Sequence, residues 1–310
     1  MYGTLDICLR KLYSLEGPPT PSALLIVRQV LTVLTFAPMH VVSQSRRDAG
    51  AATATGITGA LPEGFWKASF ELAFYIAVFQ GLLTVGVSLT EASRAGFAGQ
   101  LGLAATPCLA YSIGHKVPSC VWVACVLAIG GALLLGADGA PDGTSFAAAM
   151  LKGDNLGDLL CLASGLCWSA YILRIGILSR QHRLPAVPLQ AAKALLLCIL
   201  YAAWAAADWL LVRRCLLQDL WPGLFSPLAM LILIWAAVVP GAFGDVLMQW
   251  ASARVSGPTI SVVLAMDPVF TAGFARLLLG EHLGAYGWGG AGLIFGAAVI
   301  AEASEENGED

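Results

Sequence analysis

Long apolar segments with few charged residues most limit what this sequence can form. Each is about 20 residues long, enough for a helix to cross the hydrocarbon core of a bilayer. Only helices and closed barrels satisfy every backbone hydrogen bond there, and these segments are too continuously apolar for the alternating strands of a barrel. The sequence predicts an all-α, polytopic membrane bundle. The expected spans are residues 21–40, 66–90, 96–114, 118–137, 156–179, 185–207, 226–251, 257–279 and 284–302.

Composition supports this class and excludes several others. Only 12% of the 310 residues are charged, against about 25% in soluble domains. We therefore expect an integral, multi-pass protein of an unspecified membrane, with the lipid bilayer as its main partner. The net charge of −3 gives no basic surface for nucleic acid. The cysteines and histidines show no metal-ligand spacing, so we expect no metal or other cofactor.

The connecting segments are short, with two exceptions. Residues 41–64 are rich in Ala, Thr and Gly and contain Arg46, Arg47 and Asp48, so we expect a flexible loop there. The acidic tail, residues 303–310, is expected to be disordered.

Similar residues recur at similar offsets in the two halves of the sequence. A shift of 161 residues places Pro107 on Pro268, and a shift of 166 places Trp122 on Trp288. Their order and similar offsets indicate a duplicated unit. The expected domains are a first repeat at 1–137, a linker at 138–155 and a second repeat at 156–302.

The first repeat lacks most of one helix. A shift of 164 residues places Arg10 on Arg174, so residues 1–14 align with the end of span 156–179. We interpret this as nine full helices plus a partial first helix, with ten in the intact protein. A genuine nine-helix variant with a short amphipathic N-terminal helix is the alternative. Repeats of five helices enter the membrane from opposite sides, an inverted arrangement typical of secondary transporters.

The second half resembles a known transporter pattern. Its opening helix has Gly157-Asp158-Leu159-Leu160 with Trp168 and Tyr171, and its closing helices have Asp267-Pro268-Val269-Phe270, Leu277-Leu278-Leu279-Gly280-Glu281 and Trp288 with Gly289-Gly290-Ala291-Gly292. In order and type these residues resemble the EamA repeat of the drug/metabolite transporter superfamily. The resemblance implies ten helices, cytosolic termini and transport of metabolites such as amino acids or nucleotide precursors.

The first half departs from the EamA pattern. Thr106 stands where an acidic residue usually precedes Pro107, and His115-Lys116 stands where Gly-Glu is typical. Resemblance there is loose.

Two basic residues within spans are candidates for binding substrate. Ionisable side chains are costly at membrane depth and are often functional. Arg28 lies in span 21–40, and Lys193 lies near the corresponding position of the second repeat. Together they could bind an anionic substrate, Arg28 through two hydrogen bonds and Lys193 as a point charge. The alternative is that they extend to the membrane surface.

Two acidic residues complete the ionisable candidates. Asp245 follows Pro240 and Gly241, which could loosen the helix, and a buried carboxylate there could accept a coupling proton. Alternatively, Asp245 pairs with Arg28 or Lys193. Asp267 precedes a proline that can kink the helix, so we expect it either to cap or hinge the helix or to contact substrate.

Aromatic and glycine residues add weaker candidates. Trp168 and Tyr171 could line a cavity, although packing and the interfacial aromatic belt are common alternatives. Small residues permit close helix contact; those we expect to do so are Gly86, Gly96, Gly99, Gly102, Gly289, Gly290 and Gly292.

These features predict a secondary transporter of a small polar or anionic metabolite, working by alternating access. A membrane scaffold, an intramembrane enzyme and a channel are the alternatives. An enzyme is not expected, because the sequence has no P-loop, Gly-x-Ser-x-Gly or His-Glu-x-x-His motif. We leave homodimer formation open.

Overall fold

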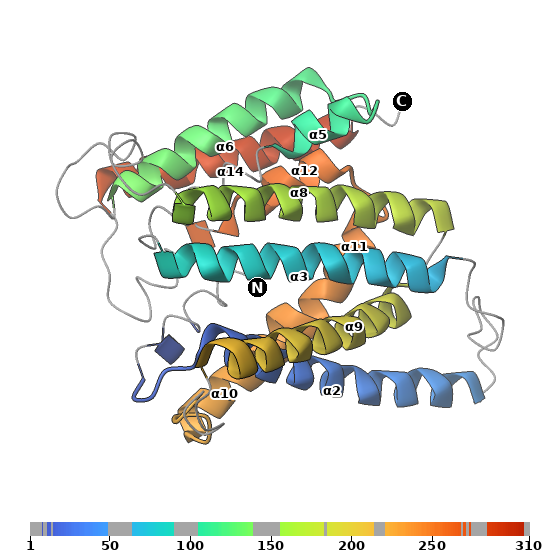
Figure 1. Ribbon diagram of the computed structural model, residues 1–310. Helices are drawn as coiled ribbons and strands as arrows, with labels where there is room; N and C mark the ends of the chain where they lie inside the picture. The colour runs from blue at the N-terminus through green and yellow to red at the C-terminus, as the bar shows by residue number, and fades with distance from the viewer. Residues whose placement is uncertain are drawn as a thin grey trace. The chain divides into compact units, whose positions relative to one another are not determined.

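The computed structural model describes residues 8, 11–13, 15–48, 64–89, 105–138, 156–182, 185–213, 221–267, 269–270, 273 and 284–306. Within these ranges the backbone forms helices and turns and no strand, which confirms the predicted all-α class (Figure 1). The helices are α2 (Pro21–Asp48), α3 (Phe65–Leu89), α5 (Thr106–Ser112), α6 (Ser119–Asp138), α8 (Leu156–His182), α9 (Ala186–Ala207), α10 (Pro227–Ala236), α11 (Gly244–Ser252), α12 (Gly257–Leu264) and α14 (Ala285–Glu306).

Two π-helical turns extend or join these helices. One, Asp208–Arg213, continues α9, and the other, Ala237–Phe243, joins α10 to α11. Four segments are long and apolar enough to cross a membrane by length and composition: Phe65–Gly86, Leu159–Gln181, Ala186–Leu210 and Pro227–Ser252. Three shorter apolar helices, within α2, α6 and α14, lie in other predicted spans.

Two predicted boundaries were wrong in the same way. Helix α2 continues to Asp48, through the first third of the segment expected to be a flexible loop, while residues 49–63 lie outside the described chain. Helix α14 continues to Glu306, into the tail expected to be disordered. A helix keeps its backbone bonds after its apolar stretch ends, so hydropathy marks the edge of the bilayer rather than the end of the helix.

Contacts divide the chain into two units, and each unit contains residues from both halves of the sequence. Unit 1 comprises Met1–Ala77 and Leu178–Trp250, and unit 2 comprises Val78–Ile177 and Ala251–Asp310. The repeat boundaries expected from sequence stay a prediction.

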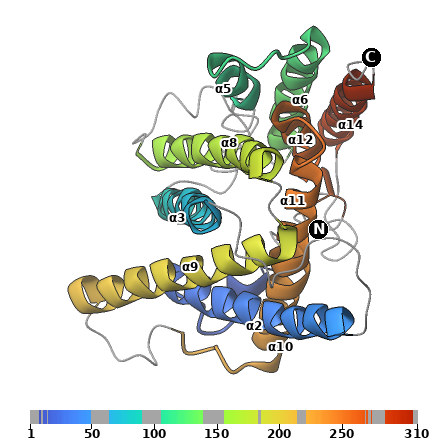
Figure 2. The ribbon, with the colours of Figure 1, turned by 90° about the vertical axis from the view of Figure 1, so that its right-hand side faces the viewer.

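In unit 1, α2 packs on α9, on α10 and on the π-helical turn at Ala237–Phe243 (Figure 2). One apolar cluster joins the N-terminal residues to this group: Leu12 is buried with Leu24 of α2 and Leu233 of α10. Residues 11–13 are helical, and Leu12 is 1% exposed, so this short segment is part of the core of unit 1.

In unit 2, α6 and α14 lie side by side along their length. Their close approach depends on Gly131, because a Cβ atom there would lie 2.6 Å from the Gly290 carbonyl oxygen and 2.6 Å from Cγ1 of Ile294. Gly86 similarly allows α3 to approach α8, since its Cβ would lie 2.5 Å from Cys161 Sγ. Gly289 and Gly292 were predicted to serve this purpose, but a Cβ on either would meet nothing within 4 Å.

We expect Gly131→Ala to destabilise unit 2 by about 1–3 kcal/mol, because backbone atoms of α14 must move to admit the methyl group. Gly130→Ala is the matched control, since a Cβ there meets nothing within 4 Å. That change should be neutral or mildly stabilising, because alanine favours the helix. Thermal unfolding of the purified protein in detergent measures both changes. Equal loss in the two variants would contradict the packing described here.

Candidate functional site

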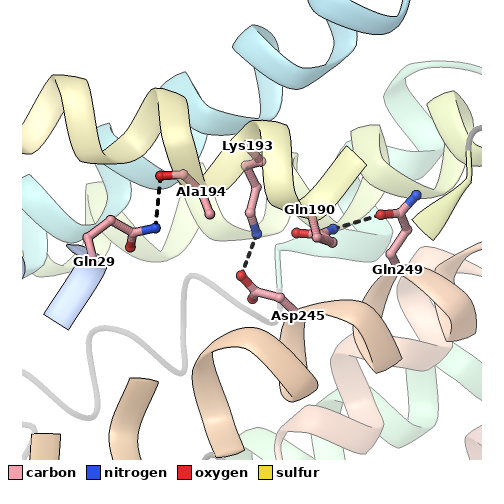
Figure 3. A network of polar contacts seen from close by, with 6 residues as sticks. All are labelled: Gln29, Gln190, Lys193, Ala194, Asp245 and Gln249. Carbon is pink, nitrogen blue, oxygen red and sulfur yellow. Dashed lines mark hydrogen bonds and ion pairs between the residues drawn. The ribbon is translucent and has the colours of Figure 1, made fainter. Parts of the chain in front are cut away.

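A buried ion pair joins α9 to α11 in unit 1. Lys193 Nζ donates to Asp245 Oδ2 at 2.8 Å (Figure 3). The Lys193 side chain is 1% exposed and that of Asp245 is 26% exposed. The ammonium group is therefore held inside the protein and does not extend to the surface. The sequence allowed Asp245 to pair with Arg28 or Lys193, and the structure shows the pair with Lys193.

The irregular backbone before α11 contains Pro240 and Gly241. Proline has no amide hydrogen for an α-helical bond, and here the chain widens into the π-helical turn Ala237–Phe243. The predicted loosening of the helix is confirmed. A Cβ on Gly241 would lie 3.0 Å from the Ala236 oxygen and 3.2 Å from Thr32 Oγ1 of α2. Asp245 lies two residues beyond this turn.

A second polar contact between α9 and α11 lies next to the ion pair. Gln190 Nε2 donates to Gln249 Oε1 at 2.9 Å, and both side chains are at most 1% exposed. Gln190 precedes Lys193 by one helical turn, and Gln249 follows Asp245 by one helical turn. From α2, Gln29 Nε2 donates to the Ala194 carbonyl oxygen at 3.1 Å. We call Gln29, Gln190, Lys193, Asp245 and Gln249 the polar cluster (Figure 3).

Apolar side chains surround the polar cluster. Phe36, Ala194 and Ala242 form a buried core there, with Val33 and Val246 packed against it. Electrostatic interactions are stronger in such surroundings than in water.

Tyr201 of α9 is another buried polar residue of unit 1, at 2% exposure. Tyr201 follows Lys193 by about two helical turns on α9, and the side chain of Arg28 is half-buried on α2. The three predicted site residues of unit 1, Arg28, Lys193 and Asp245, thus lie on three helices that contribute to the same unit.

Unit 2 contains the other three predicted site residues. Trp168 stacks between neighbours, with ring centroids 5.3 Å from Tyr171 and 4.9 Å from Phe79. Tyr171 is 1% exposed, as a packing role requires. Asp267 is half-buried. Pro268, which follows it, lies outside the described residues. Their roles in binding stay predictions.

Thr106 of unit 2, which replaces the acidic residue expected before Pro107, donates to Ser169 Oγ at 2.8 Å, and both residues are buried. The neutral side chain at this position thus makes an interhelical bond between α5 and α8.

Sequence reasoning missed Gln29, Gln190, Gln249 and Tyr201. Ionisable residues within the spans were the main sequence signal, whereas the side chains of these four residues are neutral. The available signal was helical spacing: Gln190 and Gln249 each lie one turn from a predicted charged residue.

Comparison with known proteins gives a family for part of the chain. Residues 155–302 match the EamA-like transporter family, part of the drug/metabolite transporter superfamily. No curated protein matches the sequence. Among the solved structures that match is a crystal structure with a TM-score of 0.72 at 14% identity, over 98% of this chain and 94% of that one. At this identity the match shows the fold alone. With the four long apolar helices, these findings make the chain an integral, multi-pass membrane protein.

Proposed function

We propose that this chain, whose residues 155–302 match the EamA-like transporter family, is a secondary carrier that moves a small anionic metabolite across a membrane by alternating access. The observation that carries the proposal is the buried Lys193–Asp245 pair. A basic side chain held in an apolar span is a costly feature, and such residues commonly mark substrate pathways.

Lys193 is the group that would hold the anion. Asp245 neutralises it at 2.8 Å, with almost no exposure of the lysine. A small carboxylate or phosphate has the same charge as Asp245 and can replace it as an acceptor for the ammonium. Arg28 of α2, the helix that packs on α9, adds a second positive charge on the same unit.

A proton on Asp245 would make this replacement easier. A protonated carboxyl group no longer neutralises Lys193, so the ammonium becomes available to the anion. Lys193, protonated Asp245 and a bound monoanion then have the same total charge as the Lys193–Asp245 ion pair alone. No buried charge is left uncompensated. Asp245 is the more exposed of the two partners, at 26% against 1% for Lys193.

The π-helical turn at Ala237–Phe243 supplies a place for the conformational change. Single π-helical turns occur often at functional sites, and this one directly precedes the helix that carries Asp245. A shift from π to α geometry there would rotate α11 and move Asp245 relative to Lys193.

Binding of a monoanion tests the proposal. We expect valerate to raise the thermal unfolding temperature of the purified protein in detergent, by the equivalent of about 2.7 kcal/mol at a 100-fold excess over Kd. The matched control is Lys67→Met, which removes an exposed lysine at the start of α3 and should leave the rise unchanged.

The double variant Lys193→Met/Asp245→Leu removes both charges without leaving either one unpaired. It should show no stabilisation by valerate at any pH. A rise equal to that of the wild type would show that anions bind elsewhere and would overturn the proposed role of Lys193.

A further inference from the structure

The glutamine pair of the polar cluster leaves two hydrogen-bonding atoms without partners. Gln190 Nε2 donates to Gln249 Oε1, while Gln190 Oε1 and Gln249 Nε2 have no partner, and both atoms are buried. A buried polar atom without a partner costs about 1–3 kcal/mol. Few such atoms persist in a native protein without a reason.

The two remaining atoms define a chemical requirement that does not depend on how the amides are oriented. If both amides were turned over, Gln249 would donate to Gln190, again leaving one acceptor and one donor. A ligand group that satisfies both must accept one hydrogen bond and donate another. A carboxylate only accepts and an ammonium only donates, so each satisfies one atom. A carboxamide or a hydroxyl group satisfies both.

The Gln190–Gln249 pair lies beside the Lys193–Asp245 ion pair, so one ligand could contact both pairs. Gln190 lies three residues before Lys193 on α9, and Gln249 lies four residues after Asp245 on α11. Residues at these spacings share one face of a helix, with their Cβ atoms about 5–6 Å apart. A ligand with its anionic group at Lys193 would therefore place a second group, one helical turn away, at the glutamines.

We infer that Gln190 and Gln249 form a specificity subsite for the uncharged carboxamide or hydroxyl group of a small monoanion whose charge is bound by Lys193. The inference rests on the proposed function and narrows it to substrates with an anionic and a neutral polar end. The two amides bond to each other and are buried. The neutral polar group of the substrate would leave that bond in place and satisfy the two remaining atoms, Gln190 Oε1 and Gln249 Nε2.

Two probes of similar length test the subsite. Succinamate has a carboxylate and a carboxamide, whereas valerate has a carboxylate and an alkyl end. We expect the purified wild-type protein to bind succinamate at least ~10-fold more tightly than valerate, the effect of about one good hydrogen bond to an otherwise unpartnered group. Ligand-induced stabilisation over a concentration series measures both affinities.

The variant Gln190→Leu/Gln249→Leu should bind succinamate and valerate equally, with the valerate affinity of the wild type. Gln249→Met is the second variant if the double variant does not fold, and it should also lose most of the preference. Gln80→Leu is the matched control, because Gln80 is a half-buried glutamine of α3 that belongs to unit 2 and lies outside the polar cluster. It should keep the preference.

A failure of the glutamine subsite can be distinguished from a failure of the proposed anion site. If wild-type protein binds both probes equally, and binding is lost in Lys193→Met/Asp245→Leu, the subsite is wrong and the proposed carrier function stands. The same holds if the glutamine variants keep the full preference, in which case the buried atoms hold only structural water. If neither probe stabilises the wild-type protein, both the inference and the anion site are overturned.

Discussion

Asp245→Leu is expected to destabilise the protein by about 3–5 kcal/mol, among the largest effects of any single substitution in unit 1. The change leaves the Lys193 ammonium buried at 1% exposure without its 2.8 Å partner. Breaking a buried ion pair by removing one member costs this much because the remaining charge has lost water and gains nothing in return. Chemical or thermal unfolding in detergent measures the loss.

Adding Lys193→Met to Asp245→Leu should restore most of the lost stability. Methionine fills nearly the volume of lysine without a charge, and replacing a whole buried pair by apolar residues is often neutral or stabilising. Glu16→Leu is the matched control: Glu16 is an exposed acidic residue of unit 1, so its removal should cost little stability. A double variant as unstable as Asp245→Leu would show that the two residues do not interact energetically.

The same double variant should lose uptake while keeping its fold. In proteoliposomes we expect the initial rate of uptake of small hydroxy or amide monoanions to fall by ~30-fold or more, because losing a buried charged contact costs about 2 kcal/mol or more of binding. Lys67→Met, which removes an exposed lysine, should transport at the wild-type rate. Undiminished uptake by the double variant would exclude Lys193 from the substrate pathway.

Much of the helical architecture was predictable because lipid demands continuous apolar segments. Spans 66–90 and 185–207 agree closely with α3 (Phe65–Leu89) and α9 (Ala186–Ala207). The ends that extend into polar sequence were not predictable: Arg46, Arg47 and Asp48 suggest a loop by composition, yet they continue α2. Hydropathy contains no signal for a helix that leaves the membrane.

Helix contacts were harder to predict than helices. The sequence favoured the glycine-rich stretch 289–292 as a contact face. Only part of it is: the Gly290 carbonyl oxygen lies against Gly131 of α6, whereas a Cβ on Gly289 or Gly292 would meet nothing within 4 Å. Which glycine faces a neighbour depends on the rotation of both helices, and a span uniformly rich in small apolar residues does not encode that rotation in its hydrophobic pattern.

The candidate site, too, could be predicted from the sequence only in part. Charged residues in apolar spans identified Lys193 and Asp245, because their cost at membrane depth makes them conspicuous. Gln190 and Gln249 stayed unnoticed, since a neutral amide alters hydropathy little and its importance depends on a partner 59 positions away in the chain. Only the arrangement of α9 against α11 reveals that two of their polar atoms lack partners.

Counterflow in proteoliposomes tests the carrier proposal most directly. Vesicles containing the full chain are loaded with an unlabelled small monoanion, such as succinamate, and a trace of the labelled compound is added outside. A carrier that alternates its access exchanges the two, so we expect the label to accumulate transiently above its equilibrium level, and to do so only with Lys193 and Asp245 in place. Label that rises only to equilibrium across a panel of hydroxy and amide monoanions, or that does not enter, would contradict alternating-access transport of this substrate class.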